Sequence, residues 1–346
     1  MERVLTYTLK EEDLPETADG LVNLVLKNKV RVTGHEISRA KYTEGGIAAD
    51  FDKGLHPLRK DPWPDRIFEA DGHTWIEVRV SDRIFPGQTL RVVLPDDEDR
   101  EKIIPAYGKE LSVLYEDEDV LVINKEAGVV CHPSPGHYSD TLANYVAGYL
   151  KAKGQESACR LPGRLDKETS GVLIFAKNRA SDARLVKQRE AGILSRTYLA
   201  LVRGVIDPPC GVIDTAQIKE ENCLMLRRIA ADSEEGQKAV THYEVTGIGD
   251  SACLVRIHID TGRTHQIRVH MASIGHPLIG DTLYGEEAAL QEDHIRSMPE
   301  GSARALLHAA DLSFRQPFTG EKIHVKAPLP ADFREAVFRY HIEMIP

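Results

Sequence analysis

The chain has 346 residues, of which 42 % are hydrophobic and 28 % are charged, and its formal net charge at pH 7 is -10. This balance is typical of a globular protein and excludes a disordered chain. The negative total also excludes a uniformly basic coat for nucleic acid, although a local basic cleft remains compatible with it. The length exceeds one ordinary hydrophobic core, so two domains are expected.

The five cysteines are scattered and form no Cys-x-x-Cys pair, and an odd number cannot all pair with one another. We therefore expect reduced thiols, as in a cytoplasmic protein. The first residues lack the basic and apolar regions of a secretory signal. No apolar run is long enough to span a bilayer, so no membrane partner is predicted.

Composition shifts along the chain divide it into three parts. Residues 1–95 are polar and rich in turns and are expected to form a small domain. An acidic run follows Pro95 and predicts a solvated linker over residues 96–108. Residues 109–346 contain buried strands and amphipathic helices and are expected to form the larger domain.

Local patterns in the small domain predict, in chain order, a short basic helix at 36–42, a loop at 52–71, a strand at 74–80, a turn at 86–87 and a strand at 89–94. Patterns in the larger domain predict strands at 120–123, 172–176, 197–202 and 253–259, a helix from Asn178 to Glu190, a helix that ends at Gly275 and a polar insertion at 286–304. Strands and helices mix without strict alternation, which favours an α+β fold.

The stretch GRLDKETSGVLIFAKN sets Arg164 beside Asp166 in a polar turn at the mouth of an apolar strand. Loops at strand ends commonly display functional groups. An Asp carboxylate can act as a nucleophile or a base, and it needs a nearby cation to stay ionised when it is removed from water. The pattern also fits a capping Asp that pairs with Arg164 or Lys167.

A second candidate is the stretch TGRTHQIRVH, at residues 261–270. The spacing of Thr264 and Arg268 predicts one shared helix face, from which Arg268 could reach a carboxylate. A solvated amphipathic helix is the alternative. His265 and His270 are poorly spaced as ligands, and no Cys, Asp or Glu completes a set, so no metal site is predicted.

Tyr198 begins a predicted strand in RTYLALVRG. Its ring could stack on a nucleobase and its hydroxyl could exchange a proton, or it could be a half-buried packing residue. The chain lacks G-x-S-x-G, a phosphate loop, H-E-x-x-H and a G-x-G-x-x-G after a strand. Serine hydrolases, nucleoside triphosphatases and dinucleotide enzymes therefore have no support.

Five ordered blocks resemble the RluA-type family of RNA pseudouridine synthases, over roughly Lys109 to Phe333. They are YEDEDVLVINKEAGVVCHP with TLAN, GRLDKETSGVLIFAK, RTYLALVRG with GQKAVTHYEV, TGRTHQIRVHMASIGHPLIGDTLYG, and LLHAADLSF with KAPLPADF. The resemblance implies an α+β fold with a mixed, mainly antiparallel sheet, flanking helices and a central RNA-binding cleft. It implies an isomerase that converts uridine in RNA to pseudouridine without a cofactor.

By this resemblance Asp166 is the catalytic aspartate and Arg268 is its ion-pair partner. Tyr198 lies against the target base and Ile267 packs beneath it, while Arg164 helps to open the RNA and fills the space of the extruded uridine.

The resemblance also assigns substrate binding to Arg263, His265 and Gln266 of the late block. Three positions depart from the family pattern, which has His at Gly163, Pro at Glu126 and Lys at Arg196. None of these departures removes a catalytic group, so an active enzyme is expected.

The N-terminal stretch ISRAKYTEGGIAADF resembles a diverged alpha-L RNA-binding module of the ribosomal-protein type. Ser38, Arg39 and Lys41 would then face phosphate groups. The insert at 52–71 departs from that pattern, and a small packing domain is the alternative.

Large-subunit ribosomal RNA is the expected substrate, with tRNA as an alternative, and a monomer is expected. A second class is a non-catalytic RNA-binding or ribosome-assembly factor that keeps the fold. A third is a glycosidase that uses Asp166 and Glu168, which are too close in one turn to flank a sugar.

The sequence leaves three chemical routes open: addition of the carboxylate to C6 of uracil, attack on C1′ of the ribose, and removal of the 2′ proton through a glycal.

Overall fold

A computed structural model describes residues 2–51, 56–58, 66–95, 103–155, 159–220, 223–231, 235–285 and 304–345. The chain divides into two compact units. The smaller unit contains residues 1–101 with 178–180, and the larger one contains residues 102–177 with 181–346.

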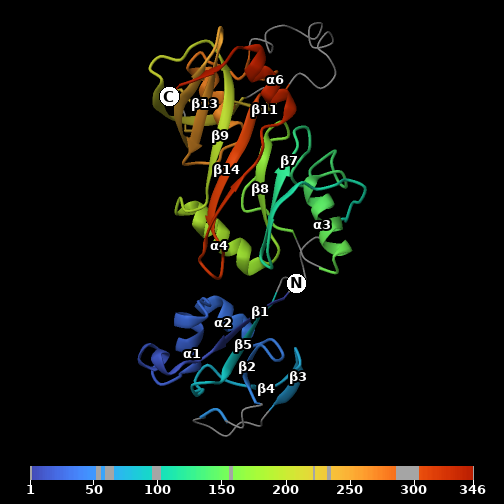
Figure 1. Ribbon diagram of the computed structural model, residues 1–346, viewed down its shortest axis with the longest axis vertical. Helices are drawn as coiled ribbons and strands as arrows, with labels where there is room; N and C mark the ends of the chain where they lie inside the picture. Colours follow the sequence, from blue (N-terminus) through green and yellow to red (C-terminus); the bar gives the residue numbers. More distant parts are fainter. Residues whose placement is uncertain are drawn as a thin grey trace. The chain divides into compact units, whose positions relative to one another are not determined.

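The smaller unit contains a five-stranded antiparallel sheet in the order β1-β5-β2-β4-β3, with short helices (Figure 1). Its elements are β1 (Arg3–Thr8), η1 (Glu11–Glu16), α1 (Val22–Leu24), η2 (Val25–Lys29), α2 (Gly34–Ala40), β2 (Ile47–Asp50), β3 (Ile67–Ala70), β4 (His73–Glu77) and β5 (Thr89–Leu94). Thr33 and Glu36 form a reciprocal capping box that starts α2. The basic helix expected at 36–42 is present but lies two residues earlier, at Gly34–Ala40, and the strand at 89–94 is confirmed.

The prediction of a loop over residues 52–71 is wrong at its end, where residues 67–70 form β3. Asp71 and Gly72 have φ of 54° and 77°, which makes the two-residue turn of a tight hairpin between β3 and β4. The strand expected at 74–80 ends at Glu77. Residues 52–55, 59–65 and the acidic run at 96–99 lie outside the described residues.

The larger unit contains an eleven-stranded sheet in the order β11-β10-β12-β13-β9-β14-β8-β7-β6, with β15 paired to β14 and β16 paired to β12. Its strands are β6 (Val113–Glu116), β7 (Val120–Lys125), β8 (Ser170–Ala176), β9 (Ser195–Arg203), β10 (Cys210–Glu220), β11 (Cys223–Ile229), β12 (Gln237–Ile248), β13 (Ala252–Ile259), β14 (Leu307–Arg315), β15 (Lys322–Lys326) and β16 (Glu343–Met344). Its helices are α3 (Leu142–Ala152), α4 (Arg179–Glu190), α5 (Gln266–Ser273) and α6 (Ala331–Arg339).

Every strand pairing in this sheet is antiparallel except that of β8 with β14, which is parallel. The α+β fold with a mixed, mainly antiparallel sheet is therefore confirmed.

The core of the larger unit is its main apolar cluster, which includes residues 120–123 of β7 and 172–176 of β8. All seven residues of β8 are buried. Leu142, Val146 and Leu150 repeat at four-residue intervals on α3 and join the same cluster. Burying each such side chain stabilises the fold by roughly 2 kcal/mol, so the strand that follows Asp166 is firmly anchored.

No helix in the described part of the chain has both the length and the hydropathy needed to cross a membrane.

Candidate active site

The chain turns sharply between Asp166 and β8. The backbone N–H of Thr169 donates to the carbonyl oxygen of Asp166 over 3.2 Å, and β8 begins at the next residue. Gly171 has a φ of +110°, and a Cβ there would lie 2.1 Å from the carbonyl oxygen of Ala309 on β14. Only glycine allows this approach. The Ser-Gly pair of the sequence motif therefore lets β14 close against the start of β8.

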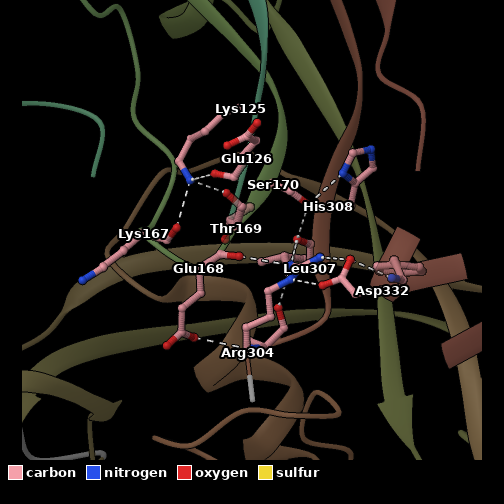
Figure 2. Close-up of polar contacts among 12 residues, drawn as sticks. Lys125, Glu126, Lys167, Glu168, Thr169, Ser170, Arg304, Leu307, His308 and Asp332 are labelled. Atoms are coloured by element: carbon pink, nitrogen blue, oxygen red, sulfur yellow. Dashed lines mark hydrogen bonds and ion pairs between the residues drawn. The ribbon is translucent and has the colours of Figure 1, made fainter. Parts of the chain in front are cut away.

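Lys125 holds this turn from the end of β7 (Figure 2). The side chain is 1 % exposed, and its ammonium donates to the carbonyl oxygens of Glu126 (2.8 Å), Lys167 (2.9 Å) and Thr169 (2.7 Å). All three donors are thus used. Burial lowers the pKa of Lys125 to about 8, and the charge of Asp166 acts in the opposite direction. The carbonyls on both sides of Glu168 are fixed to one buried cation.

Arg304 holds the same turn from the other side (Figure 2). Its Nη1 donates to the carbonyl oxygen of Glu168 (3.1 Å), while Nε and Nη2 donate to the Asp332 carboxylate on α6 (2.6 and 3.1 Å). Burial raises the pKa of Asp332, but the hydrogen bond and charge of Arg304 outweigh it and lower the pKa overall. The assignment of Arg304 to a polar insertion was wrong, because it is 8 % exposed. Residues 286–303 lie outside the described residues.

Arg268 lies on α5 and pairs with Asp281, not with Asp166. Its Nε and Nη2 donate to the two Asp281 oxygens over 2.7 and 2.6 Å, and Nη2 lies 3.4 Å from Oε2 of Glu168. Asp281 is fully enclosed, whereas Asp166 is half-buried. An enclosed carboxylate needs a paired cation more than one in contact with water. The expected ion pair between Arg268 and Asp166 is therefore corrected.

The shared helix face of Thr264 and Arg268 is also corrected, because α5 begins only at Gln266. Thr264 lies before the helix, and the intervening His265 has a left-handed backbone.

Asp166 nevertheless has several predicted site residues around it. Its charge acts on the pKa of five groups that come from distant parts of the chain: Lys125, Cys131, Tyr198, His265 and Arg268. Such effects require proximity, because the interaction of two charges falls with their separation. The charge of Asp166 thus reaches Tyr198, His265 and Arg268, and Arg268 also lies 3.4 Å from Glu168 in the same turn.

Tyr198 on β9 is 5 % exposed and packs in the main core with Ile267, which is 4 % exposed. Burial raises the pKa of the Tyr198 hydroxyl, so it is neutral at physiological pH. Arg164 is exposed, two residues before Asp166.

The amide of Gln266 is fully engaged within the fold. Its nitrogen donates to the carbonyl oxygen of Val240 and to Thr241, and its oxygen accepts from Thr261 and from the backbone N–H of Arg263. No donor or acceptor remains free for a substrate. Arg263 is exposed, and its Nε donates to the carbonyl oxygen of Lys238 over 3.0 Å.

In the smaller unit, Ser38 and Lys41 are exposed at the end of α2, and Arg39 is partly exposed. In the described part of the chain, no group of three His, Cys, Asp or Glu side chains could hold a metal ion.

Sequence reasoning missed Lys125, Arg304 and Asp332, which hold the Asp166 turn, and Asp281, which pairs with Arg268. Lys125 offered a weak signal, since a charged residue closes the apolar run 120–123. The other three gave none, because their partners lie far along the chain.

Comparison with known proteins agrees with this geometry. The family model described as RNA pseudouridylate synthase matches residues 119–273. The RNA pseudouridine synthase YhcT of Bacillus subtilis is 38 % identical over 76 % of this chain and 80 % of its own length. The ribosomal large subunit pseudouridine synthase D of Zymomonas mobilis is 37 % identical over 65 % of this chain and 71 % of its own length.

Two solved human structures are also similar. RNA Pseudouridylate Synthase Domain Containing 4 is 25 % identical, with a TM-score of 0.53, over 68 % of this chain and 95 % of that one. RNA Pseudouridylate Synthase Domain Containing 1 is 26 % identical, with a TM-score of 0.51, over 70 % of this chain and 99 % of that one.

The mainly antiparallel sheet and these comparisons together define an RNA-modifying enzyme. The chain belongs to the RluA-type family of RNA pseudouridine synthases.

Proposed function

We propose that this enzyme converts uridine to pseudouridine in RNA of the large ribosomal subunit, with Asp166 as the catalytic carboxylate. Several similar proteins carry the name ribosomal large subunit pseudouridine synthase D, from Zymomonas mobilis, Neisseria meningitidis, Vibrio cholerae and others. Their names support the choice of ribosomal RNA over tRNA.

One observation carries this proposal: the backbone of the Asp166 turn is held in place by hydrogen bonds, while the Asp166 carboxylate itself has no partner among the described residues. Lys125 and Arg304 fix the backbone carbonyls of residues 167–169. Within the described residues, no hydrogen bond or ion pair occupies the Asp166 carboxylate itself. A group that is positioned but unpaired is ready to act on a bound substrate, and preorganisation of this kind supplies much of a catalytic rate.

The reaction breaks the N1–C1′ bond, turns the uracil and forms a C5–C1′ bond, after which C5 loses its hydrogen to water. The base must first leave the stack, which costs roughly a few kcal/mol. Arg164, exposed beside Asp166, would enter the vacated space, and Tyr198 and Ile267 would lie against the base. Addition to C6, attack on C1′ and the glycal route all begin from an ionised Asp166 at this position.

We further propose that the enzyme acts in the cytoplasm, as a monomer, without a cofactor or metal. Ser38, Arg39 and Lys41 of the smaller unit would contact RNA phosphates. Such contacts release counterions, so RNA affinity should fall as salt rises.

The test uses RNA labelled with tritium at C5 of uridine. Wild type, Asp166→Asn and the control Asp250→Asn would be assayed on ribosomal RNA and on tRNA from cells that lack the protein. Asp250 is a surface residue that pairs with His341. We expect tritium release from ribosomal RNA by wild type and the control, and none by Asp166→Asn. Release from tRNA alone would replace the proposed substrate, and release by Asp166→Asn would reject the catalytic assignment.

A further inference from the structure

His265 has an uncommon backbone conformation directly before α5, the helix that carries Arg268. Its φ is 56° and its ψ is 20°, in the left-handed region that only a few per cent of residues other than glycine adopt, most often asparagine, aspartate and histidine. Such a conformation costs roughly 1 kcal/mol or more and persists where the surrounding structure enforces it, most often at functional sites. The backbone thus places this particular side chain at the start of α5 despite the strain.

Tyr284 fixes the orientation of the His265 ring. Nδ1 of His265 lies 2.8 Å from the Tyr284 hydroxyl oxygen, which also accepts a 3.0 Å hydrogen bond from the backbone N–H of Arg227 on β11. A hydroxyl has one donor and two acceptor lone pairs, so with the bond from Arg227 in place it can still donate its own proton to Nδ1. In that arrangement the neutral ring carries its proton on Nε2. The Arg268 guanidinium lies 5.3 Å from the centre of the Tyr284 ring and holds the phenol in place.

Charged groups face the His265 ring from four segments. Asp166 comes from the turn before β8, Arg268 from α5, Asp281 from the chain after α5, and Arg227 from β11. Burial lowers the pKa of His265, the two guanidinium groups lower it further, and the two carboxylates act in the opposite direction. The pKa lies below its ordinary value overall, so the ring is neutral at physiological pH.

The second ring nitrogen is open to a bound molecule. Nε2 of His265 has no hydrogen-bond partner among the described residues, and it is not one of the enclosed side-chain atoms that lack a partner. After burial, the charge of Asp166 has the largest effect on the ring. Contacts also link the ring to the Asp166 turn, since its partner Tyr284 packs against Arg268, which lies 3.4 Å from Glu168. No hydrogen bond or ion pair joins the described side chains of His265 and Asp166. A protonated ring would pair with Asp166, whereas a neutral one leaves the carboxylate free.

We propose that the Nε2–H of His265 donates a hydrogen bond to a carbonyl oxygen of the target uracil, and so stabilises the negative charge that the base gains when N1–C1′ breaks. This role rests on the proposed function. The electron pair of the broken bond passes to N1 and is shared with the carbonyl oxygens. The pair then forms the C5–C1′ bond, after which C5 loses a proton and N1 gains one. His265 keeps its own proton throughout.

Two substitutions of His265 test the Nε2–H donor separately from the rest of the side chain. His265→Asn tolerates the left-handed backbone and can still bond to Tyr284, but it has no group at the position of Nε2. His265→Gln extends about as far as Nε2 and keeps a donor there. We expect His265→Asn to lower kcat by about 10²-fold, the usual effect of removing one preorganised donor, with KM within about threefold of wild type. His265→Gln should lose less than about tenfold.

The matched control is His324→Asn on β15, an exposed histidine that pairs with Asp311. It should keep the activity of wild type. Equal losses from His265→Asn and His265→Gln, or a loss confined to KM, would overturn the donor role.

Nitrogen-15 NMR of the imidazole rings tests the same proposal without RNA. At neutral pH we expect His265 to have a bare Nδ1 and a protonated Nε2, and Tyr284→Phe to remove that preference. A ring protonated on Nδ1, or on both nitrogens, would overturn the proposal. If wild type released no tritium from either RNA pool, the proposed substrate would be wrong, while the NMR signals would still decide whether His265 presents a donor.

Discussion

The ammonium of Lys125 and the carbonyl oxygen of Thr169 are joined by a 2.7 Å hydrogen bond across 44 positions of sequence. The bond ties the end of β7 to the last residue of the turn that begins at Asp166. The same ammonium reaches the carbonyl of Lys167, which also accepts from the backbone N–H of Gly128. The position of Asp166 therefore depends on a cation that does not touch it.

Replacing Lys125 with methionine should loosen the turn without emptying the core. The substitution keeps the length of the side chain but leaves the carbonyls of Glu126 and Thr169 without this donor. Since hydrogen bonds to charged groups contribute about 1.5–3 kcal/mol each and the buried charge is costly, we expect a net loss of roughly 2 kcal/mol in the free energy of unfolding. A shift of about 1 Å in Asp166 would lower turnover by about 10²-fold. Urea denaturation and tritium release measure the two effects.

The control for this substitution is Lys109→Met. Lys109 pairs with Glu126 near the surface, where its side chain is 28 % exposed. An exposed pair of this kind contributes about 0–1 kcal/mol, so both stability and turnover should stay close to wild type. Wild-type turnover in Lys125→Met would show that the turn holds its shape without the buried ammonium.

Asp281→Asn should lower stability, whereas Asp166→Asn should lower activity, because Arg268 pairs with Asp281. Removing one partner of a buried pair costs about 3–5 kcal/mol, so Asp281→Asn should unfold at a much lower urea concentration. Asp166→Asn should stay within about 0.5 kcal/mol of wild type and lose activity. If Asp166→Asn were the less stable variant, Arg268 would depend on Asp166 in solution after all.

The elements that the sequence predicted well are those whose signal is local. The apolar runs of β7 and β8 and the alternation in β13 follow from neighbouring residues alone. The hairpin at β3 and β4 was missed because charge and proline upstream hid the Asp71-Gly72 turn. The strand β10 was missed because its two faces are of mixed polarity.

The ion pairs around the site could not be predicted from the sequence, for a different reason. Arg304 closes a polar run and looks solvated, and its burial depends on Asp332, 28 residues later. The resemblance assigned Arg268 to Asp166, whereas its partner is Asp281, the carboxylate that the fold encloses. Local pattern carries no information on such long-range burial.

Glu116 on β6 should make the larger unit sensitive to acid. Burial raises the pKa of Glu116, but hydrogen bonds from Lys153, Lys177 and Tyr149 outweigh it and bring the pKa to about 2. A carboxyl with a lowered folded-state pKa stabilises the fold above its unfolded value of about 4.3 and loses that stabilisation as pH falls toward 2. Wild type should lose about 2 kcal/mol over this interval through Glu116.

Glu116→Gln should be less stable than wild type near pH 6 and approach it near pH 2.5. Urea denaturation of both proteins across that range measures the difference, and parallel curves at all pH values would contradict this assignment.

Arg196 on β9 should reduce stability and support activity at the same time. Its Nε and Nη2 are enclosed and have no hydrogen-bond partner among the described residues. A Cβ on Gly163 would lie 3.2 Å from its Nη1, and the side chain hydrogen-bonds with Tyr198. Buried donors without a partner destabilise a fold, and such groups are retained where function requires them. We expect Arg196→Met to raise the free energy of unfolding by about 1 kcal/mol and to lower turnover by about tenfold. Urea denaturation and tritium release measure both. A variant less stable than wild type would mean that the guanidinium is satisfied within the fold and that its place beside Gly163 and Tyr198 is structural.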